Sequence, residues 1–352
     1  MTEYRSELGG LADPASHQTP LDVAGVDPAM LMGFLTDMLT IRLTEETIGR
    51  LVEEGLARTP CHLAIGQEAI AVGIPVWLRS GDRVFGGHRS HSHILAMGGD
   101  IFGLIAEILG KESGVSRGMG GSMHLHAPSV GFHGCVPLVG ATIPIAVGAA
   151  LAARMDGKGA IAVSFFGDGA AEEGVFHESL NLAATQRLPI LFVCENNLFS
   201  SHLDILLRQP SDRIARFADA HAIRSLTVDG NDVLAVAAAA RSLAAHARSG
   251  NGPAFLEAVT YRHRGHVGPK EDIDVGVRRT MTELNKWKLR DPITRLAEGM
   301  MATGLIDEHR LDSLRENIGR KVADARARAE AAPYPDPSAL LGLVYRSADA
   351  RH

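Results

Sequence analysis

The chain has 352 residues, of which 45% are hydrophobic and 22% charged, so it can bury a large core in one or two domains. Its formal net charge is −6, which provides no basic field for nucleic acid or an anionic membrane surface. The three cysteines form no CxxC pair, and the N-terminal segment has no apolar run typical of a signal peptide. We therefore expect a cytoplasmic protein that does not span a membrane.

The first half of the chain is predicted to combine an arm, a long helix and loops. Residues 1–26 are rich in Gly, Pro and polar side chains and are expected to form a flexible N-terminal arm, followed by a single domain over 27–352. Apolar residues recur at helical spacing over 28–56, which predicts a long amphipathic helix. Residues 61–135 are rich in Gly and His, and we expect functional loops there, with short helices such as 101–110.

The second half of the chain alternates between strand and helix patterns. A small-residue helix over 141–155 precedes two predicted β-α-β units, and a charged, mostly solvated helix over 311–332 follows them. Strands that alternate with helices imply an α/β fold with a parallel sheet flanked by helices on both faces. The two units comprise strand 160–166, helix 171–186 and strand 189–195, then strand 225–228, helix 232–248 and strand 254–261.

The segment AVSFFGDGAAEEG, residues 162–174, places Asp168 between two glycines directly after an apolar strand. The next predicted strand ends in a polar pair, Asn196 and Asn197. Because consecutive strands of a β-α-β unit tend to be neighbours, a carboxylate and an amide oxygen are expected to converge at the carboxyl edge of the sheet, where ligands bind. Oxygen ligands of this kind suit Mg²⁺ bound through the phosphates of a ligand. The metal would explain an aspartate in a glycine-rich turn that otherwise attracts phosphate.

Ordinary local structure can also produce this pattern. An aspartate after a strand can cap the following helix, and a pair of asparagines is common in turns. The dinucleotide fingerprint G-x-G-x-x-G fails because Glu172 stands at the third glycine position, and the chain has no G-x-x-x-x-G-K-[ST] motif. A Mg²⁺-dependent enzyme that acts on a phosphorylated small molecule fits the same two residues.

Residues 167–197 resemble the thiamine diphosphate motif of the α subunit of 2-oxo acid dehydrogenase E1 components. This group includes the pyruvate, branched-chain 2-oxo acid and acetoin dehydrogenases. A GDG…NN pair alone occurs across thiamine diphosphate enzymes, whereas an ordered set of further segments makes the resemblance far more specific. These segments are CHLAIGQEAIAVGI (61–74), GHRSHSHILAMGGD (87–100), RGMGGSMHLH (117–126), PLVGATIPIAVGAA (137–150), YRHRGH (261–266) and WKLRDPI (287–293).

The resemblance implies a Mg²⁺ site and a diphosphate site around the GDG turn. The side chains of Asp168 and Asn197 and the backbone carbonyl of Phe199 would ligate Mg²⁺. The backbone N–H groups of Gly169 and Ala170 would hold the diphosphate of thiamine diphosphate.

Further residues would surround the rest of the cofactor. Arg89 would clamp the diphosphate with its guanidinium, next to His88, which stands where the family usually has tyrosine. Backbone groups of Pro137 and Val139 would face the aminopyrimidine ring.

The same resemblance implies the reaction. His266 would contact the phosphates and, with His62, would line the substrate approach as a catalytic residue. The cofactor would accept the electrons released when a 2-oxo acid, by default pyruvate, loses CO₂, and the acyl group would pass to a lipoyl-bearing E2 acyltransferase. Acetoin and branched-chain 2-oxo acids are the alternative substrates. A Mg²⁺-dependent enzyme without thiamine and a non-catalytic assembly subunit are the alternatives from other classes.

The chain carries only the diphosphate-binding half of such a site. Glu172 and Glu173 follow the metal turn and are expected at the wrong end of the cofactor to activate its aminopyrimidine. In the family a β subunit supplies that carboxylate, so we expect an α₂β₂ heterotetramer with the cofactor at the α–β boundary. The chain alone is expected to be inactive.

Two further patterns suggest negative expectations. The loop over 265–279 has no Ser or Thr, so we predict that phosphorylation does not switch it. Two groups of histidines lack an HExxH or CxxC context, so a zinc site is not favoured at either. They are His88, His91 and His93, and His124, His126 and His133.

Overall fold

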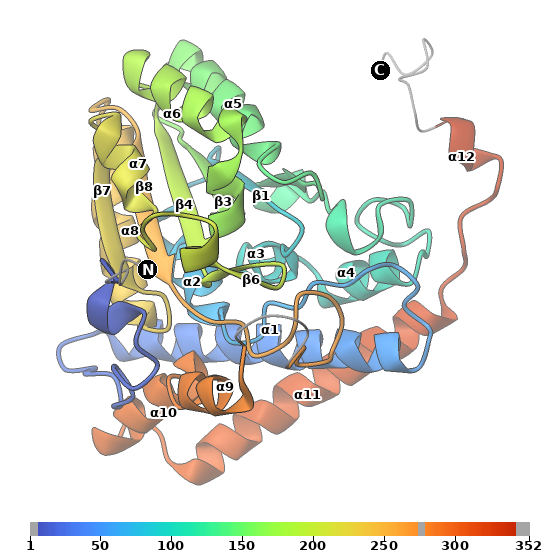
Figure 1. Ribbon diagram of the computed structural model, residues 1–352. Coiled ribbons are helices and arrows are strands. Elements are labelled where there is room, and N and C mark those ends of the chain that lie inside the picture. Colours follow the sequence, from blue (N-terminus) through green and yellow to red (C-terminus); the bar gives the residue numbers. More distant parts are fainter. Residues whose placement is uncertain (1–5, 274–278, 343–352) are drawn as a thin grey trace.

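The computed structural model describes residues 6–273 and 279–342 of the chain. At its centre is a six-stranded parallel sheet with the strand order β2-β1-β3-β4-β8-β7 (Figure 1). The predicted α/β fold with a parallel sheet is therefore confirmed. The strands are β1 Arg83–Gly86, β2 Phe132–Cys135, β3 Ala162–Gly167, β4 Ile190–Asn196, β7 Arg224–Asp229 and β8 Ala254–Val259.

The central strands are apolar because helices cover both faces of the sheet. All seven residues of β4 and all six of β8 are buried. Alternate side chains of a strand point to opposite faces, and β3 shows the division. Val163 and Phe165 join one hydrophobic cluster, whereas Ala162 and Phe166 join another. The sheet therefore separates two cores.

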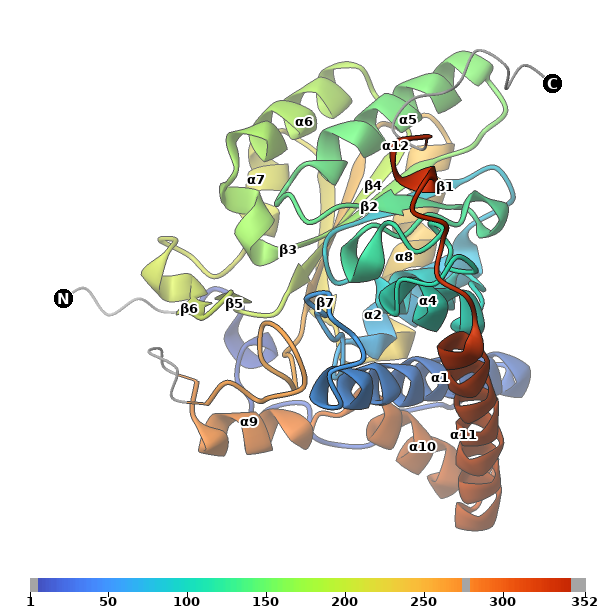
Figure 2. The same cartoon turned by 90° about the vertical axis from the view of Figure 1, so that its right-hand side faces the viewer.

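Seven helices flank the sheet in these two cores. Helices α5, α6 and α7 cover one face, and α2, α3, α4 and α8 cover the other (Figures 1 and 2). Helix α8 illustrates why these segments are helical, because the Asp232 carboxylate caps its first turn and its buried residues recur at helical spacing. The bounds are α2 Glu68–Gly73, α3 His91–Ala96, α4 Ile101–Ile108, α5 Thr142–Asp156, α6 Gly174–Thr185, α7 Ala215–Ala220 and α8 Val233–Arg248.

Helices α1, α10 and α11 pack below the sheet in the view of Figure 1 and help to enclose a third hydrophobic cluster, whereas Leu284 and Trp287 of α9 join the cluster of α5 to α7. The predicted first helix is confirmed as α1 and ends earlier than expected, before Gly55. The C-terminal helix α11 is exposed on one side, as predicted, but it also packs against α1 and α4 through residues such as Ile318 and Val322. Within the described residues, no helix has the length and apolar character needed to cross a bilayer. The bounds are α1 Pro28–Glu53, α9 Met281–Lys288, α10 Pro292–Ala302, α11 Glu308–Ala331 and a short α12 Ala339–Gly342.

The expectation that residues 61–135 form functional loops with short helices missed two strands. This segment supplies β1 and β2 of the sheet, together with α2, α3 and α4. Both strands are only four residues long, with the sequences RVFG and FHGC, so neither has the apolar run of a typical buried strand. Their position in the sheet is set by the pairing of β1 with β3 and β2, which local sequence does not encode.

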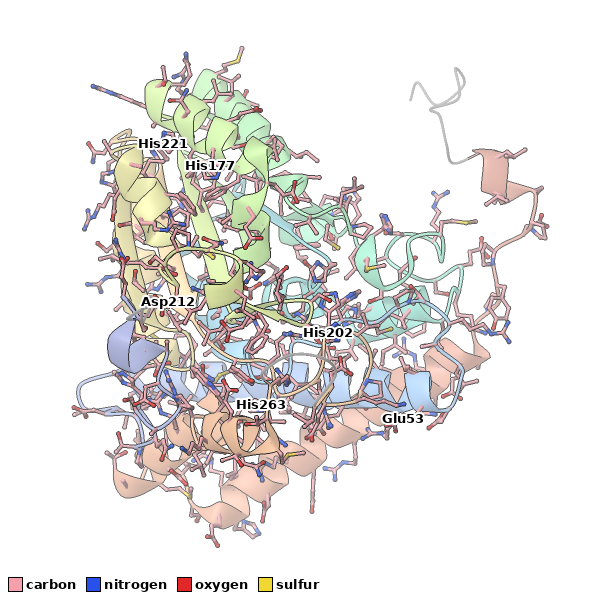
Figure 3. The ribbon with its side chains drawn as sticks, in the orientation of Figure 1. Glu53, His177, His202, Asp212, His221 and His263 are labelled. Carbon is pink, nitrogen blue, oxygen red and sulfur yellow. The ribbon has the colours of Figure 1, made fainter. Side chains whose placement is uncertain are left out.

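The N-terminal residues pack against the domain. The Asp212 carboxylate, labelled in Figure 3, accepts hydrogen bonds from the side chain of Ser6 and from the backbone N–H groups of Glu7 and Leu8. Leu8 and Leu21 are buried in two different hydrophobic clusters. Residues 6–26 thus add side chains to the core of the domain, and the predicted boundary at residue 26 stays a prediction.

Candidate active site

The carboxyl ends of β3 and β4 form the floor of the candidate site. The two strands are parallel neighbours with Gly167 paired to Glu195, so Asp168 and the Asn196–Asn197 pair emerge at the same edge of the sheet. A cavity of about 310 Å³ opens there. It is lined by every site residue predicted from the sequence, namely His62, His88, Arg89, Pro137, Val139, Asp168, Gly169, Ala170, Asn197, Phe199 and His266.

Asp168 follows β3 directly and is 1% exposed. Burial raises the pKa of its carboxyl above the usual value, while the Arg208 guanidinium, which forms an ion pair with it, opposes that rise. The predicted helix over 171–186 begins later than expected, because residues 168–172 form a 3₁₀ turn and α6 starts at Gly174. A Cβ at Gly169 would lie 2.4 Å from Ser200 Oγ, so a side chain there would displace Ser200, which also lines the cavity. The turn therefore brings backbone close to the cavity.

The structure separates the roles of the two asparagines after β4. The Asn196 side chain is fully engaged within the protein, where its Nδ2 donates to Glu257 Oε1 (2.8 Å) and to the Asp212 carbonyl (2.9 Å). Asn197 lines the cavity, and its Oδ1 accepts a hydrogen bond from the backbone of Phe199 (3.3 Å). Asn197 is thus the asparagine of the pair that faces the cavity.

Phe199 lies in a small antiparallel hairpin beside the cavity. Strand β5, Phe199–Ser200, pairs with β6, Leu203–Asp204. Leu198 precedes it with a φ of 68°, a left-handed conformation that turns the chain sharply after β4. The Phe199 ring packs edge-on against Tyr261, with centroids 5.8 Å apart. The ring is packed in the core, and Phe199 is also one of the residues that line the cavity.

Arg89 is a buried cation in the cavity wall. Its Nη1 donates to the Leu63 carbonyl (2.6 Å) and its Nη2 to the His266 carbonyl (3.2 Å). Burial lowers the pKa of Arg89 to about 10, so the guanidinium remains protonated at neutral pH. A charge that has lost its water in this way favours an anionic ligand.

Three imidazoles from separate segments meet at one side of the cavity. The ring centroids of His62, His88 and His266 lie 4.5 to 5.5 Å apart. Burial is the main cause that lowers their pKa values, to about 2, about 3 and about 4 respectively, and the charge of Arg89 lowers each further. All three rings are therefore neutral near pH 7, and each offers one donor and one acceptor.

The same trio has ligand atoms within 4.8 Å of one another, which is close enough to suggest a metal site. Arg89 and Arg262 lie beside the three imidazoles, and their positive charges would repel a metal cation there. The charges favour binding of a ligand carboxylate or phosphate instead.

The segment that carries His62 is held rigidly by buried polar contacts. Glu45 Oε1 accepts from the backbone N–H of Ala64 (2.9 Å), and Glu45 Oε2 pairs with His91 Nδ1 (2.9 Å). His91 Nε2 in turn contacts Ser122 Oγ (2.7 Å). His62 Nδ1 has no hydrogen-bond partner among the residues that the structure describes, although the atom is buried. It is available to a ligand.

One wall of the cavity is unusually apolar and exposed. Leu138 is 69% exposed and Val139 52% exposed, although both side chains are large and hydrophobic. They lie between Pro137 and Gly140, at the entrance to α5. Exposed apolar side chains grouped at the mouth of a polar cavity are typical of a surface that another protein covers.

Most of the chain matches one known protein family. The match is to the family model described as dehydrogenase E1 component, over residues 36–338. The chain belongs to this family. The E1 family predicted from the sequence motifs is thereby confirmed.

The relatives of this chain include alpha subunits of pyruvate dehydrogenases and of acetoin oxidoreductases. The chain is 37% identical to the pyruvate dehydrogenase E1 component subunit alpha of Rhizobium meliloti, over 86% of this chain and 86% of the relative. It is 37% identical to the alpha subunit of acetoin:2,6-dichlorophenolindophenol oxidoreductase of Bacillus subtilis, over 88% of this chain and 92% of the relative. The human somatic mitochondrial pyruvate dehydrogenase E1 alpha subunit is 33% identical, over 88% and 78%.

Sequence reasoning missed an arginine and a glutamate that line the candidate site. Arg262 lines the cavity, donates from Nη2 to the Ser201 carbonyl (2.9 Å), and has no partner for Nη1 among the described residues. Burial, together with the neighbouring arginines, lowers its pKa to about 9. Glu195 also lines the cavity, where it pairs with His93 (3.2 Å). Arg262 lies within the YRHRGH motif, but only its burial distinguishes it from an ordinary surface arginine.

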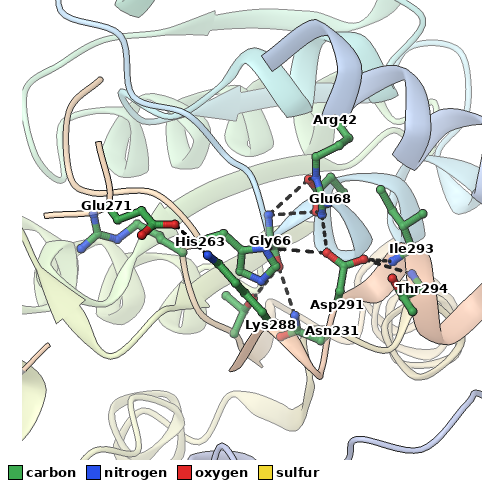
Figure 4. A network of polar contacts seen from close by, with 12 residues as sticks. Arg42, Gly66, Glu68, Asn231, His263, Glu271, Lys288, Asp291, Ile293 and Thr294 are labelled. Carbon is green, nitrogen blue, oxygen red and sulfur yellow. Dashed lines mark hydrogen bonds and ion pairs between the residues drawn. The ribbon is translucent and has the colours of Figure 1, made fainter. Parts of the chain in front are cut away.

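Behind the cavity, a network of buried charges ties the motif segments together (Figure 4). Arg42 of α1 donates from Nη2 to Glu68 Oε2 (3.0 Å) and to Asp291 Oδ2 (2.7 Å). Glu68 Oε2 also accepts from the Gly66 N–H (3.0 Å). Burial lowers the pKa of nearby His263 to about 3. The network fixes the backbone on which His62 and His266 are placed.

The remaining histidines do not form zinc clusters among the described residues. His91 pairs with Glu45, and His93 with Glu195. His124 Nδ1 contacts the Gly120 carbonyl and His126 Nδ1 the His133 carbonyl. The three cysteines are buried and free, and burial raises the pKa of each thiol; they are Cys61, Cys135 and Cys194.

Proposed function

We propose that this chain is the α subunit of a thiamine diphosphate-dependent E1 enzyme. The enzyme decarboxylates a 2-oxo acid, pyruvate by default, and transfers the acyl group to the lipoyl arm of an E2 acyltransferase. The observation that supports this most strongly is the cavity itself, because residues of separate motifs converge there at the carboxyl edge of a parallel sheet. Acetoin is the second candidate substrate, because an acetoin oxidoreductase subunit is as similar to this chain as a pyruvate dehydrogenase subunit.

The residues around the cavity fit thiamine diphosphate with Mg²⁺. Asp168, Asn197 and the Phe199 carbonyl would ligate the metal, since carboxylate, amide and carbonyl oxygens suit it. Gly169 and Ala170 would donate backbone N–H groups to the diphosphate. The space at Gly169, which a Cβ would fill, supports this close approach.

The cationic wall fits the anionic end of the cofactor. Arg89, with His88 and His266 beside it, would hold the diphosphate, and Arg262 adds a second buried positive charge. Backbone groups of Pro137 and Val139 would face the aminopyrimidine. When bound, the cofactor supplies the electron sink that accepts the pair released on loss of CO₂.

The neutral imidazoles of His62 and His266 would bind the substrate through hydrogen bonds. His62 Nδ1 is buried without a described partner, so it can accept or donate a hydrogen bond at the keto or carboxylate oxygen of a 2-oxo acid. His266 lies 4.9 Å away, ring to ring, and would act on the same substrate. Because both rings are neutral near pH 7, each would offer one N–H donor and one acceptor nitrogen to the oxygens of the substrate.

The cavity supports a two-chain active site. Asp168 and Glu195 are the acidic side chains that line it among the described residues. Asp168 would be committed to the metal, and Glu195 pairs with His93, so neither is placed to activate the aminopyrimidine. A β subunit in an α₂β₂ heterotetramer would supply that carboxylate and would cover Leu138 and Val139. The cytoplasmic location inferred from the sequence stays a prediction.

Co-expression with a candidate β chain tests the proposal. Thiamine diphosphate with Mg²⁺ should bind the complex by calorimetry, and an artificial electron acceptor should report decarboxylation of pyruvate, branched 2-oxo acids or acetoin. Asp168→Ala should abolish cofactor binding, whereas Asp312→Ala, on the C-terminal helix α11 away from the cavity, should leave it unchanged. Turnover by the chain alone would refute the two-chain site. Wild-type activity of Asp168→Ala would refute the proposed metal ligand and favour an assembly role.

A further inference from the structure

Arg208 forms an ion pair with Asp168, the carboxylate that we propose as a ligand of Mg²⁺. It lies just after the hairpin of β5 and β6, and its side chain is only 6% exposed. Its guanidinium forms ion pairs with Asp168 Oδ2 and with Glu172 Oε1, and its Nε donates to the Leu203 carbonyl (3.1 Å). A buried arginine that touches two carboxylates holds a fixed place.

The Asp168 carboxylate cannot bind Mg²⁺ and the Arg208 guanidinium at the same time without repulsion between the two cations. Arg208 takes one of its carboxylate oxygens, and a divalent ion on the other oxygen would lie within a few ångströms of the guanidinium. Like charges at that separation in a buried site repel each other strongly. Binding of the metal and pairing of Arg208 with Asp168 are therefore in competition.

Glu172 gives Arg208 a place to withdraw to. Its carboxylate is 35% exposed and already accepts from Arg208 and from Gln209 Nε2 (2.9 Å). Arg208 can leave Asp168 and keep one ion pair, so it is never an unpaired buried charge. Arg208 can therefore adopt two positions, one paired with both Asp168 and Glu172 and one paired with Glu172 alone.

The same arginine is tied to the third proposed ligand. Leu203, whose carbonyl accepts from Arg208, pairs in the hairpin with Ser200, directly after Phe199. A shift of Arg208 toward Glu172 would therefore change its hydrogen bond to Leu203 and could move β5, the strand that carries the Phe199 carbonyl.

We propose that Arg208 is a positioning residue that competes with Mg²⁺ for Asp168 and weakens metal binding until a diphosphate is present. The inference rests on the proposed function, since it assigns Asp168 to Mg²⁺. The diphosphate adds ligands and negative charge that offset the repulsion from Arg208, so metal and cofactor bind as a unit. This chain thereby avoids holding the metal alone.

Binding of Mn²⁺, a paramagnetic substitute for Mg²⁺, tests the competition directly. Electron paramagnetic resonance of the full chain, co-purified with a β subunit, measures free and bound Mn²⁺ with and without thiamine diphosphate. Arg208→Gln should tighten Mn²⁺ binding without cofactor by about tenfold or more, the scale by which one neighbouring charge changes the proton affinity of a carboxylate. Arg208→Lys should stay close to the wild type.

Two further variants make the test independent of folding defects in Arg208→Gln. Glu172→Gln removes the negative charge of the alternative acceptor, so Arg208 should hold Asp168 more firmly and Mn²⁺ binding should weaken. Arg213→Gln is the matched control, because Arg213 belongs to the same part of the chain but pairs with Asp219 away from the cavity. It should bind Mn²⁺ as the wild type does.

The outcomes separate this inference from the proposed function. If the wild type binds Mn²⁺ with thiamine diphosphate, but Arg208→Gln binds it equally or more weakly without cofactor, the competition is refuted and the function stands. If the wild type binds no Mn²⁺ even with the cofactor, the proposed metal site fails, and this inference fails with it. Tighter binding in Arg208→Gln together with weaker binding in Glu172→Gln supports the competition.

Discussion

Glu107 is a buried carboxylate that organises the glycine-rich loop beside the site. The side chain, on α4, accepts hydrogen bonds from four backbone N–H groups at 2.7 to 3.0 Å, and no arginine or lysine pairs with it among the described residues. A Cβ at Gly114 would lie 2.3 Å from Glu107 Oε2, so the backbone wraps tightly around the carboxylate. The donors are the N–H groups of Ser116, Gly118, Gly120 and Gly121.

We expect Glu107→Gln to destabilise the fold measurably. The amide keeps one acceptor oxygen but presents an NH₂ to two of the four donors, so two charge-assisted hydrogen bonds are lost. At about 1.5 to 3 kcal/mol each the loss is about 3 to 6 kcal/mol, and partial exposure of the loop favours the lower end. For a chain of 352 residues, a loss of about 3 kcal/mol corresponds to a fall of roughly 4 °C in the unfolding midpoint.

Thermal unfolding and amide hydrogen exchange check this prediction. The four donating amides should exchange faster in Glu107→Gln, and activity of the complex should fall because Met123, just after this loop, lines the cavity. Glu112→Gln, an exposed neighbour, is the control and should change neither quantity. If Glu107→Gln unfolds within about 1 °C of the wild type with unchanged exchange, the carboxylate does not hold the loop, and the reasoning is refuted.

Substitutions in the charge network, the glycine turn and the imidazole trio test three more features of the structure. Arg42→Met should lower the free energy of unfolding by about 3 to 5 kcal/mol, because it leaves the buried Glu68 and Asp291 carboxylates without their cation. Denaturant unfolding measures this loss, and a loss under about 1 kcal/mol would contradict the stabilising role of the network. Gly169→Ala should weaken thiamine diphosphate binding with little effect on folding, whereas Gly174→Ala, where a Cβ meets nothing within 4 Å, should bind normally in calorimetry. Burial lowers the pKa of His88 to about 3 from 6.5, so the unfolded chain binds the extra proton and stability falls as pH drops below 6.5. His88→Gln should therefore flatten the decline in unfolding midpoint between pH 6.5 and about 4.5, and an unchanged slope would show that His88 is not buried as a neutral ring.

The β-α-β pattern and the GDG turn could be predicted from local sequence. The runs AVSFFG and ILFVCEN are continuous and apolar, and the intervening helix has its own periodicity, so each element carries its own signal. Adjacency of β3 and β4 then follows from the preference of consecutive strands to pair. This was enough to place Asp168 and the asparagine pair at one edge. Part of the predicted loop over 265–279, residues 274–278, lies outside the described residues, so the expectation that phosphorylation does not switch it stays a prediction.

Which side chains face the cavity depended on contacts between distant segments. Asn196 and Asn197 are identical in type and adjacent, and only the position of Glu257 on β8 decides that Asn196 is structural. The arginines at 208 and 262 look like surface residues in the sequence, yet both are buried beside Asp168.

Local sequence determined the elements of this protein and the chemistry of its turn, because hydrophobic period and glycine placement act over a few residues. Tertiary structure alone decided the strands β1 and β2, the meeting of three imidazoles, and the ion pair between Arg208 and Asp168. Burial, charge repulsion and hydrogen-bond satisfaction are set by neighbours that lie far away along the chain, and those neighbours exist only once the sheet has formed.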